Sequence, residues 1–136
     1  MEALKKYNPY LKENLIVKLT FQFALDHVKF VELLESSRKY AIANQLIRSG
    51  TSIGANVREA QNAESKADFI HKIKVAAKEA EETEYWLEIC HHSDSYPNCK
   101  DLLAQILGIK KVLSKIISSS KASTNSRINK SSNQNA

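Results

Sequence analysis

The sequence predicts an all-α fold, an antiparallel up-down-up-down four-helix bundle built by a single domain. Its 136 residues include only three glycines and two prolines, so few turns interrupt the chain. Apolar residues recur at steps of four and three in four segments of about 20 residues, the spacing of packed helices. Short polar stretches separate these segments, and short connections favour antiparallel neighbours.

The first helix is expected over residues 14–35. One apolar stripe steps by four and three through Val17, Phe21, Ala24, Val28 and Val31. A second stripe lies beside it and comprises Ile16, Phe23, Phe30 and Leu34. Since a single bundle core needs one stripe per helix, we expect this helix to be buried on two sides. Phe23 and Phe30 are therefore candidates for an oligomer interface.

The second helix is expected over residues 38–63 and contains the unusual stretch RSGTSIGANV. A phosphate-binding loop would need G-x-x-x-x-G-K-[ST] after a strand, whereas Gly50 and Gly54 are spaced G-x-x-x-G with no lysine following. A loop or hinge is a second interpretation, because each glycine costs a helix about 1 kcal/mol relative to alanine. Apolar residues nevertheless keep the helical phase across the stretch. We therefore interpret it as a thin central helix in which Gly50 and Gly54 permit close helix packing.

The third helix is expected over residues 66–91. Its seam comprises Phe69, Ile73, Ala76, Ala80, Thr83, Leu87 and Cys90. A second stripe, about 100° around the helix, comprises Val75, Glu79, Glu82, Trp86 and Ile89. This stripe suits either the edge of one bundle core or a contact between subunits. We favour the contact between subunits, because tryptophan is enriched at interface anchors, and assign Val75, Trp86 and Ile89 to it.

The fourth helix is expected over residues 99–118, after a turn that contains Pro97. Its seam comprises Leu102, Ile106, Ile109, Leu113 and Ile116. Residues 120–136 contain one large apolar residue, Ile128, and no periodic pattern. We therefore expect a bundle domain over residues 1–119 and a disordered basic tail over residues 120–136.

The segment QLIRSGTSIGANVREAQNAESKADFIHKIKVAAKEAEETEYWLEI, residues 45–89, resembles a known family. It is similar to the signature of four-helix-bundle proteins encoded in intervening sequences of bacterial 23S rRNA genes, which share a fold with accessory variability proteins of diversity-generating retroelements. The resemblance extends loosely to the first helix and stops before the tail. It implies a homopentameric ring with basic surfaces and, from the retroelement relatives, binding to RNA and to a reverse transcriptase. It implies no enzymatic activity.

Enzymatic and metal chemistry are disfavoured on residue spacing. Glu88 and His91 match the Glu-x-x-His pattern of di-iron bundles, and Asp68 and His71 match it loosely. Both pairs lie on the third helix about 30 Å apart, so they cannot share a site within one chain. A zinc site would draw on Cys90, His91, His92 and Cys99. Adjacent histidines diverge by about 100° on a helix and no C-x-x-C hairpin is present, so we expect no metal, cofactor or catalytic residue.

Composition bounds the location and the partners. Two cysteines give no disulfide framework, and the sequence offers neither an apolar signal core nor a membrane span, so we expect a cytoplasmic protein with no membrane partner. The net charge of +5 and the isoelectric point near 9.2 suit an anionic partner.

Lysines are the candidate ligands for such a partner. Residues 66–78 carry four lysines against one aspartate, whereas residues 79–88 carry five glutamates. The candidates for binding the backbone of RNA or DNA are Lys74, Lys78, Lys110, Lys111 and Lys115. A solvated charged surface is the commoner reason for such lysines, but a ring of five chains would multiply weak contacts with phosphates. The alternative function is a pentameric scaffold for a protein partner such as a reverse transcriptase.

Overall fold

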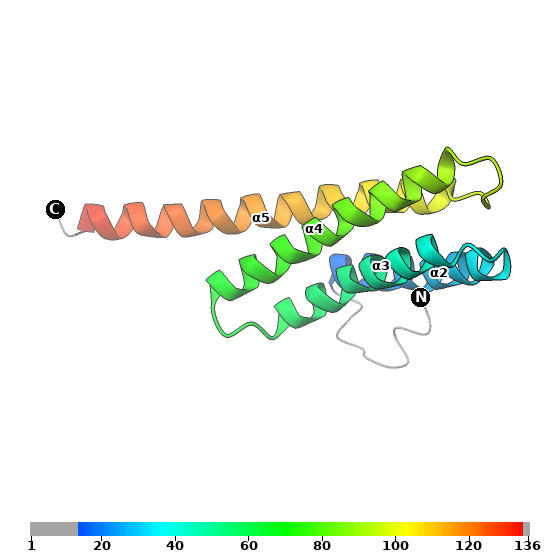
Figure 1. Ribbon diagram of the computed structural model, residues 1–136. Helices are drawn as coiled ribbons and strands as arrows, with labels where there is room; N and C mark the ends of the chain where they lie inside the picture. Colours follow the sequence, from blue (N-terminus) through cyan, green and yellow to red (C-terminus); the bar gives the residue numbers. More distant parts are fainter. Residues whose placement is uncertain (1–13, 135–136) are drawn as a thin grey trace.

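The computed structural model describes residues 14–134, with side chains described as far as residue 122. The described part is all-helical and forms a four-helix bundle, which confirms the predicted fold class at this level. The helices are α2 (Leu15–Ser36), α3 (Tyr40–Gln61), α4 (Lys66–His91) and α5 (Lys100–Gln134). Figure 1 shows α2 and α3 lying side by side, and α5 packs against both α4 and α2.

Capping residues set the beginnings of two helices. The side chain of Asn14 accepts a hydrogen bond from the amide of Val17 at 3.4 Å, and Ser65 Oγ accepts one from the amide of Asp68 at 3.0 Å. These bonds satisfy amides that the first turn of a helix leaves without a partner. Between α2 and α3, Arg38 adopts a left-handed backbone conformation with φ of 61°. That conformation ends α2 and lets the chain reverse within a few residues.

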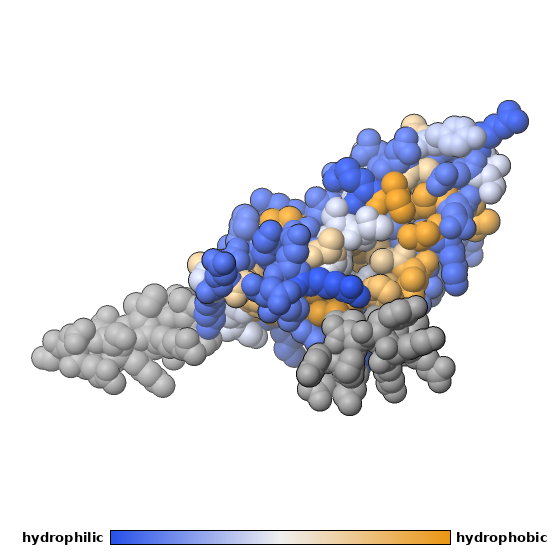
Figure 2. Space-filling model, turned by 90° about the horizontal axis from the view of Figure 1, so that it is seen from below, coloured by the Kyte–Doolittle hydropathy of each residue, from blue (hydrophilic) through white to orange (hydrophobic). Residues whose placement is uncertain are grey.

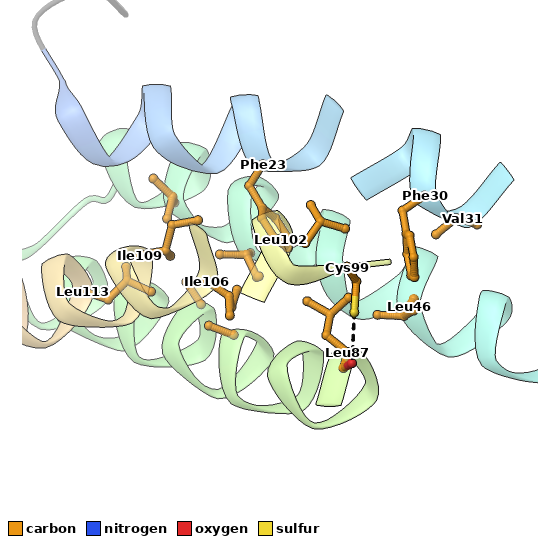
Figure 3. Close-up of a cluster of buried hydrophobic side chains, with 14 of the residues drawn as sticks. Phe23, Phe30, Val31, Leu46, Leu87, Cys99, Leu102, Ile106, Ile109 and Leu113 are labelled. Atoms are coloured by element: carbon orange, nitrogen blue, oxygen red, sulfur yellow. Dashed lines mark hydrogen bonds between the residues drawn. The ribbon is translucent and has the colours of Figure 1, made fainter. Parts of the chain in front are cut away.

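The core draws side chains from all four helices (Figure 3). On α2 the buried seam steps by four and three through Ile16, Thr20, Phe23, His27, Phe30 and Leu34. Phe23 is 0% exposed and Phe30 is 4% exposed, so the chain's own core already encloses both candidates for an oligomer interface. The predicted interface role of these two phenylalanines is therefore wrong.

The predicted seam of α2 was displaced by one position for a specific reason. Two of its buried positions hold polar residues, Thr20 and His27, which an apolar pattern does not count. The stripe through Phe21, Ala24 and Val28 is only half-buried. The helix therefore has one seam toward the bundle core, flanked by a half-buried stripe.

Helix α5 is longer than predicted. We expected it to end at residue 118 and the following residues to be disordered, but the helix continues to Gln134. No glycine or proline follows Gly108, so the sequence contains no residue that stops the helix. The residues after 118 contain few apolar side chains, which predicts that this part of the helix does not pack. Figure 1 shows α5 running past the beginning of α4 without a neighbouring helix. Residues 135 and 136 lie outside the described part.

Two features that would indicate a function are absent from the described residues. Over residues 14–134, none of the helices is long and apolar enough to cross a membrane. The same described residues contain no group of three histidine, cysteine, aspartate or glutamate side chains placed to hold a metal ion.

Candidate nucleic-acid interface

Lys110 on α5 is held by two ion pairs with α4. Its Nζ lies 2.8 Å from Glu81 Oε1 and 3.1 Å from Glu84 Oε1. The hydrogen bond with Glu81 raises the pKa of Lys110, and Glu84 adds to the effect, while burial opposes it. Its side chain is 25% exposed. Lys110 is therefore neutralised within the bundle and, contrary to prediction, is not a free cation for nucleic acid.

Lys121 lies on the same side of α5 as Lys110, about three turns further along. Eleven residues bring a helix round to within about 20° of the starting direction, so α5 presents Lys121 to α4 as it presents Lys110. The side chain of Lys121 meets that of Lys74 on α4, and this contact is the largest cause that lowers the pKa of Lys74. Repulsion from Lys121, burial and repulsion from Lys78 add to it.

Lys74, Lys78 and Lys121 together form what we call the α4–α5 lysine cluster. All three are exposed. Within the described side chains, no ion pair joins any of them to a carboxylate. Neighbouring like charges repel one another. An anion bound at the cluster would therefore reduce the electrostatic repulsion among the three lysines. Sequence reasoning missed Lys121 because it assigned that residue to a disordered tail.

Lys111 and Lys115 are exposed but lie elsewhere on α5. Helical geometry turns them about 100° and 140° away from Lys110. They therefore form a second basic stretch on the outer side of α5, separate from the cluster that faces α4.

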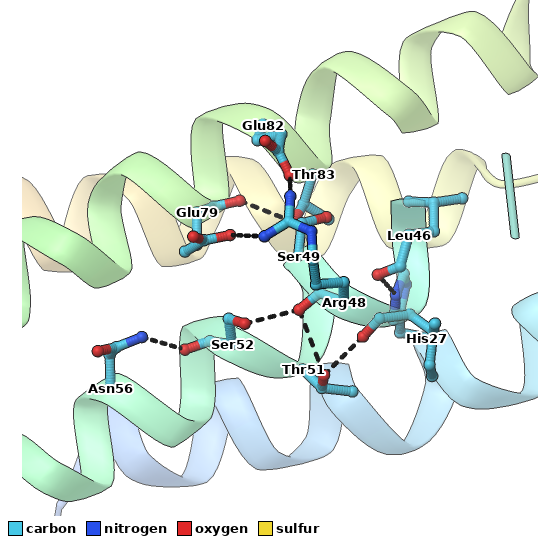
Figure 4. Close-up of polar contacts among 11 residues, drawn as sticks. His27, Leu46, Arg48, Ser49, Thr51, Ser52, Asn56, Glu79, Glu82 and Thr83 are labelled. Atoms are coloured by element: carbon cyan, nitrogen blue, oxygen red, sulfur yellow. Dashed lines mark hydrogen bonds and ion pairs between the residues drawn. The ribbon is translucent and has the colours of Figure 1, made fainter. Parts of the chain in front are cut away.

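Four of the five glutamates in the acidic half of α4 pair with a cation of a neighbouring helix. Arg48 on α3 lies 3.5 Å from Glu79 and also pairs with Glu82 (Figure 4). Glu81 and Glu84 hold Lys110 as described above. In the basic half of α4, Lys72 pairs with Glu59 at 3.2 Å. Lys74, Lys78 and Lys121 thus stay without an acidic partner where the first half of α4 meets the end of the packed part of α5.

The stretch RSGTSIGANV lies entirely within α3. At Gly50, α3 approaches α2 closely, because a Cβ added at this position would lie 2.2 Å from Nε2 of His27 on α2. His27 is fully buried, bonds to the carbonyl of Leu46 at 2.6 Å and stacks on Phe23. At Gly54 an added Cβ would lie 3.5 Å from Thr20, which is an ordinary van der Waals contact. The two glycines therefore differ in how much they constrain the packing.

Polar side chains of this stretch are engaged within the bundle (Figure 4). Thr51 Oγ1 donates to the carbonyl of Ile47 at 2.5 Å, and Ser52 Oγ donates to that of Arg48 at 2.7 Å. On the other side of α3, Thr83 Oγ1 donates to Ser49 Oγ at 2.9 Å in a buried contact with α4. These bonds satisfy hydroxyl groups inside a helix, and they assign the stretch a packing role.

Apolar side chains reach the surface in several places. On α4, Val75 and Trp86 are half-buried, Ile89 is 36% exposed and Tyr85 is 58% exposed. A groove of about 420 Å³ between α2 and α5 is lined by Leu19, Gln22, Ala104, Gln105, Gly108, Ile109 and Val112. Figure 2 shows apolar areas among the hydrophilic surface on the face seen from below. Val75, Trp86 and Ile89 thus remain accessible for a contact, in contrast to Phe23 and Phe30.

The two cysteines lie at the other end of α4 from the lysine cluster. Cys90 and Cys99 are both buried free thiols, and Cys99 Sγ donates to the carbonyl of Leu87 at 3.3 Å. Burial raises the pKa of Cys90 to about 12, with a further contribution from Cys99. A protonated thiol is a poor metal ligand and a poor nucleophile. His91 and His92 point outward and are exposed.

Comparison with known proteins shows similarity to one family and to solved structures. A family model described as 23S rRNA-intervening sequence protein matches residues 12–115. The chain is also similar to the 1.70 Å crystal structure of a protein with unknown function from the S23 ribosomal protein family of Bacteroides thetaiotaomicron VPI-5482. The two are 39% identical, the match covers 76% of this chain and 98% of that chain, and the TM-score is 0.72. No curated protein matches at a significant level. The family match ends within α5, before Lys121.

Proposed function

Because this chain belongs to the family of 23S rRNA-intervening sequence proteins, we propose that it is a non-enzymatic, oligomeric bundle that binds the phosphate backbone of RNA. The observation that carries this proposal is the α4–α5 lysine cluster, whose three cations have no acidic partner among the described side chains. Backbone binding by lysines is electrostatic and indifferent to base sequence. Lys111 and Lys115 extend the basic surface around α5.

The topology and the assembly belong to the same proposal. Asn14 at the start of α2 bonds to Gln61 at the end of α3 at 2.8 Å, and Asp26 bonds to Gln105 on α5 at 3.0 Å. Such pairings support the up-down-up-down arrangement. The apolar groove between α2 and α5, together with exposed Tyr85 and Ile89, offers surface for self-association. A homopentamer, which the family resemblance implies, would place five lysine clusters on one particle and strengthen weak contacts through multivalency.

The test is the salt dependence of binding to a mixed-sequence RNA, followed by fluorescence anisotropy. Each phosphate contact should contribute about −0.7 to the log–log slope for a single strand. Replacing Lys74, Lys78 and Lys121 by glutamine should flatten the slope and weaken binding. The matched control replaces Lys18, Lys29 and Lys100, which removes the same charge from other parts of the bundle. Equal losses in both variants would contradict a localised site, and no binding by the wild type at low salt would contradict the function.

A second candidate is an oligomeric scaffold for a protein partner such as a reverse transcriptase. The observation that favours it is the pair Tyr85 and Trp86, whose ring centroids lie 5.2 Å apart on a face that leaves Tyr85 largely exposed. Aromatic residues of this kind are frequent anchors in protein interfaces. Substituting Tyr85 by serine separates the two functions, because it should weaken a protein contact and leave the RNA salt slope unchanged.

A further inference from the structure

The α4–α5 lysine cluster lies where α5 leaves the bundle. Lys110 pairs with Glu81 and Glu84 on α4, and three turns further along α5 Lys121 lies beside Lys74. Beyond this point α5 continues to Gln134 without another helix at its side (Figure 1). The cluster is therefore the last place at which a described side chain of α5 meets α4.

The part of α5 beyond the bundle has little to stabilise it as a helix. An isolated helix shorter than about 12–15 residues is marginal in water, because nucleation is costly and no packing offsets it. The segment is rich in serine and asparagine, which are poor helix formers. Repulsion between Lys74 and Lys121 further weakens the contact at its base. The helix thus leaves the bundle at a point where the electrostatics oppose its attachment.

A phosphate group would reverse the sign of that interaction. Placed between ammonium groups, it accepts charge-assisted hydrogen bonds from each of them. A shallow pocket of about 160 Å³ adjoins the cluster and is lined by Ala77, Lys78, Glu81, Lys110 and Ser114. Its far side is acidic, since Glu81 already holds Lys110, so the phosphate belongs on the side of Lys78, Lys74 and Lys121.

We propose that a phosphate group held between Lys74, Lys78 and Lys121 fastens the end of α5 to the bundle, so that phosphate binding and helical order over residues 118–134 are coupled. The inference rests on the proposed function in that RNA is one source of the phosphate. A free polyphosphate anion is the other source and offers the same chemistry. Coupling means that each process favours the other by the same factor.

The experiment is amide hydrogen exchange on the full chain at low salt, with and without a short mixed-sequence RNA or inorganic tripolyphosphate. Either ligand that binds the cluster should slow exchange over residues 118–134 by about fivefold or more, the lower end of typical coupling. Lys121→Gln and Lys74→Gln should abolish this added protection. Lys100→Gln is the matched control, because it removes the same charge from an exposed side chain in the first turn of α5, far from the cluster, and should leave the protection intact.

The outcomes separate this inference from the proposed function. RNA that binds without slowing exchange in the segment overturns the inference and leaves the proposed function standing. Tripolyphosphate that slows exchange while RNA fails to bind supports the phosphate site and overturns the proposed function. Failure of both ligands overturns both. Equal loss of protection in Lys100→Gln and Lys121→Gln, or full protection without ligand, also overturns the coupling.

Discussion

The bundle contains two opposite kinds of helix contact. One joins α2 and α3 at Gly50, and the other joins α4 and α5 at Lys121. At the first, a buried imidazole fills the space that the glycine leaves, and the approach is too close for even a methyl group. At the second, exposed ammonium groups face one another and the helix continues past them. The first contact is satisfied by the chain itself, whereas the second has unbalanced charge. Such a contrast separates residues that build the fold from residues available to a ligand.

The largest expected effect comes from filling the space at Gly50. Gly50→Ala places a Cβ against the ring of His27, which cannot move away because it is buried and bonded to Leu46. We expect the free energy of unfolding to fall by about 3 kcal/mol or more, the upper range of overpacking. Denaturant unfolding of the purified protein measures this change.

Gly54→Ala is the control on the same helix. Its Cβ would make only an ordinary contact with Thr20, while alanine improves helix propensity by about 1 kcal/mol. This variant should therefore be neutral or slightly stabilised. Similar destabilisation at both positions would show that the close approach at Gly50 has no special role.

A smaller effect is expected from titrating His27. Burial lowers its pKa below 6.5, against an opposing hydrogen bond to Leu46, and its Nδ1 has no partner among the described residues. The unfolded chain therefore binds more protons at this site than the folded chain does. The stabilisation is complete above pH 6.5 and is lost as pH falls through the folded pKa.

His27→Gln removes this titration and keeps an amide that donates to Leu46. Its stability should depend less on pH over the window below pH 6.5 than that of the wild type. His91→Gln, at an exposed position, is the control and should keep the wild-type pH dependence. Thermal melts across a pH series compare the three proteins. Identical slopes for His27→Gln and the wild type would rule out His27 as the source.

The smallest expected effect distinguishes two adjacent lysines. Lys110→Gln breaks a partly exposed ion-pair network and should cost about 0.2–1 kcal/mol in the free energy of unfolding. Lys111→Gln removes the same charge from an exposed side chain and should stay within about 0.5 kcal/mol of the wild type. For RNA binding the order reverses, with the larger loss at Lys111. Denaturation and anisotropy on both variants check this exchange of roles.

Much of the fold was accessible from the sequence because apolar spacing and capping residues are local signals. Four helices follow from the periodicity, and the close approach at Gly50 follows from a helical phase that persists through poor helix formers. The buried positions of Thr20 and His27 could not be found in this way, because polar residues at a seam look like breaks in an apolar stripe.

The candidate site was less accessible, because charge pairing depends on which helices meet. Lys110 and Lys111 are indistinguishable as letters, yet one meets two glutamates and the other meets solvent. The place of Lys121 in the cluster could not be predicted without knowing that α5 continues past residue 118 and how α5 aligns with α4. One signal in the sequence does relate the two lysines. Lys121 follows Lys110 by eleven residues, which is about three turns along one side of a helix.

The buried thiols at the turn between α4 and α5 are natural probes of local opening of the bundle. Cys90 and Cys99 are 1% and 2% exposed, and Cys90 stays protonated across the ordinary pH range because its pKa is about 12. An alkylating reagent needs an accessible thiolate, so it reacts only when this end of the bundle separates. The rate of labelling therefore counts spontaneous openings of the α4–α5 pair. Because the thiols lie at the other end of α4 from the lysine cluster, the labelling rate shows whether binding at the cluster changes the opening of the distant end of the bundle.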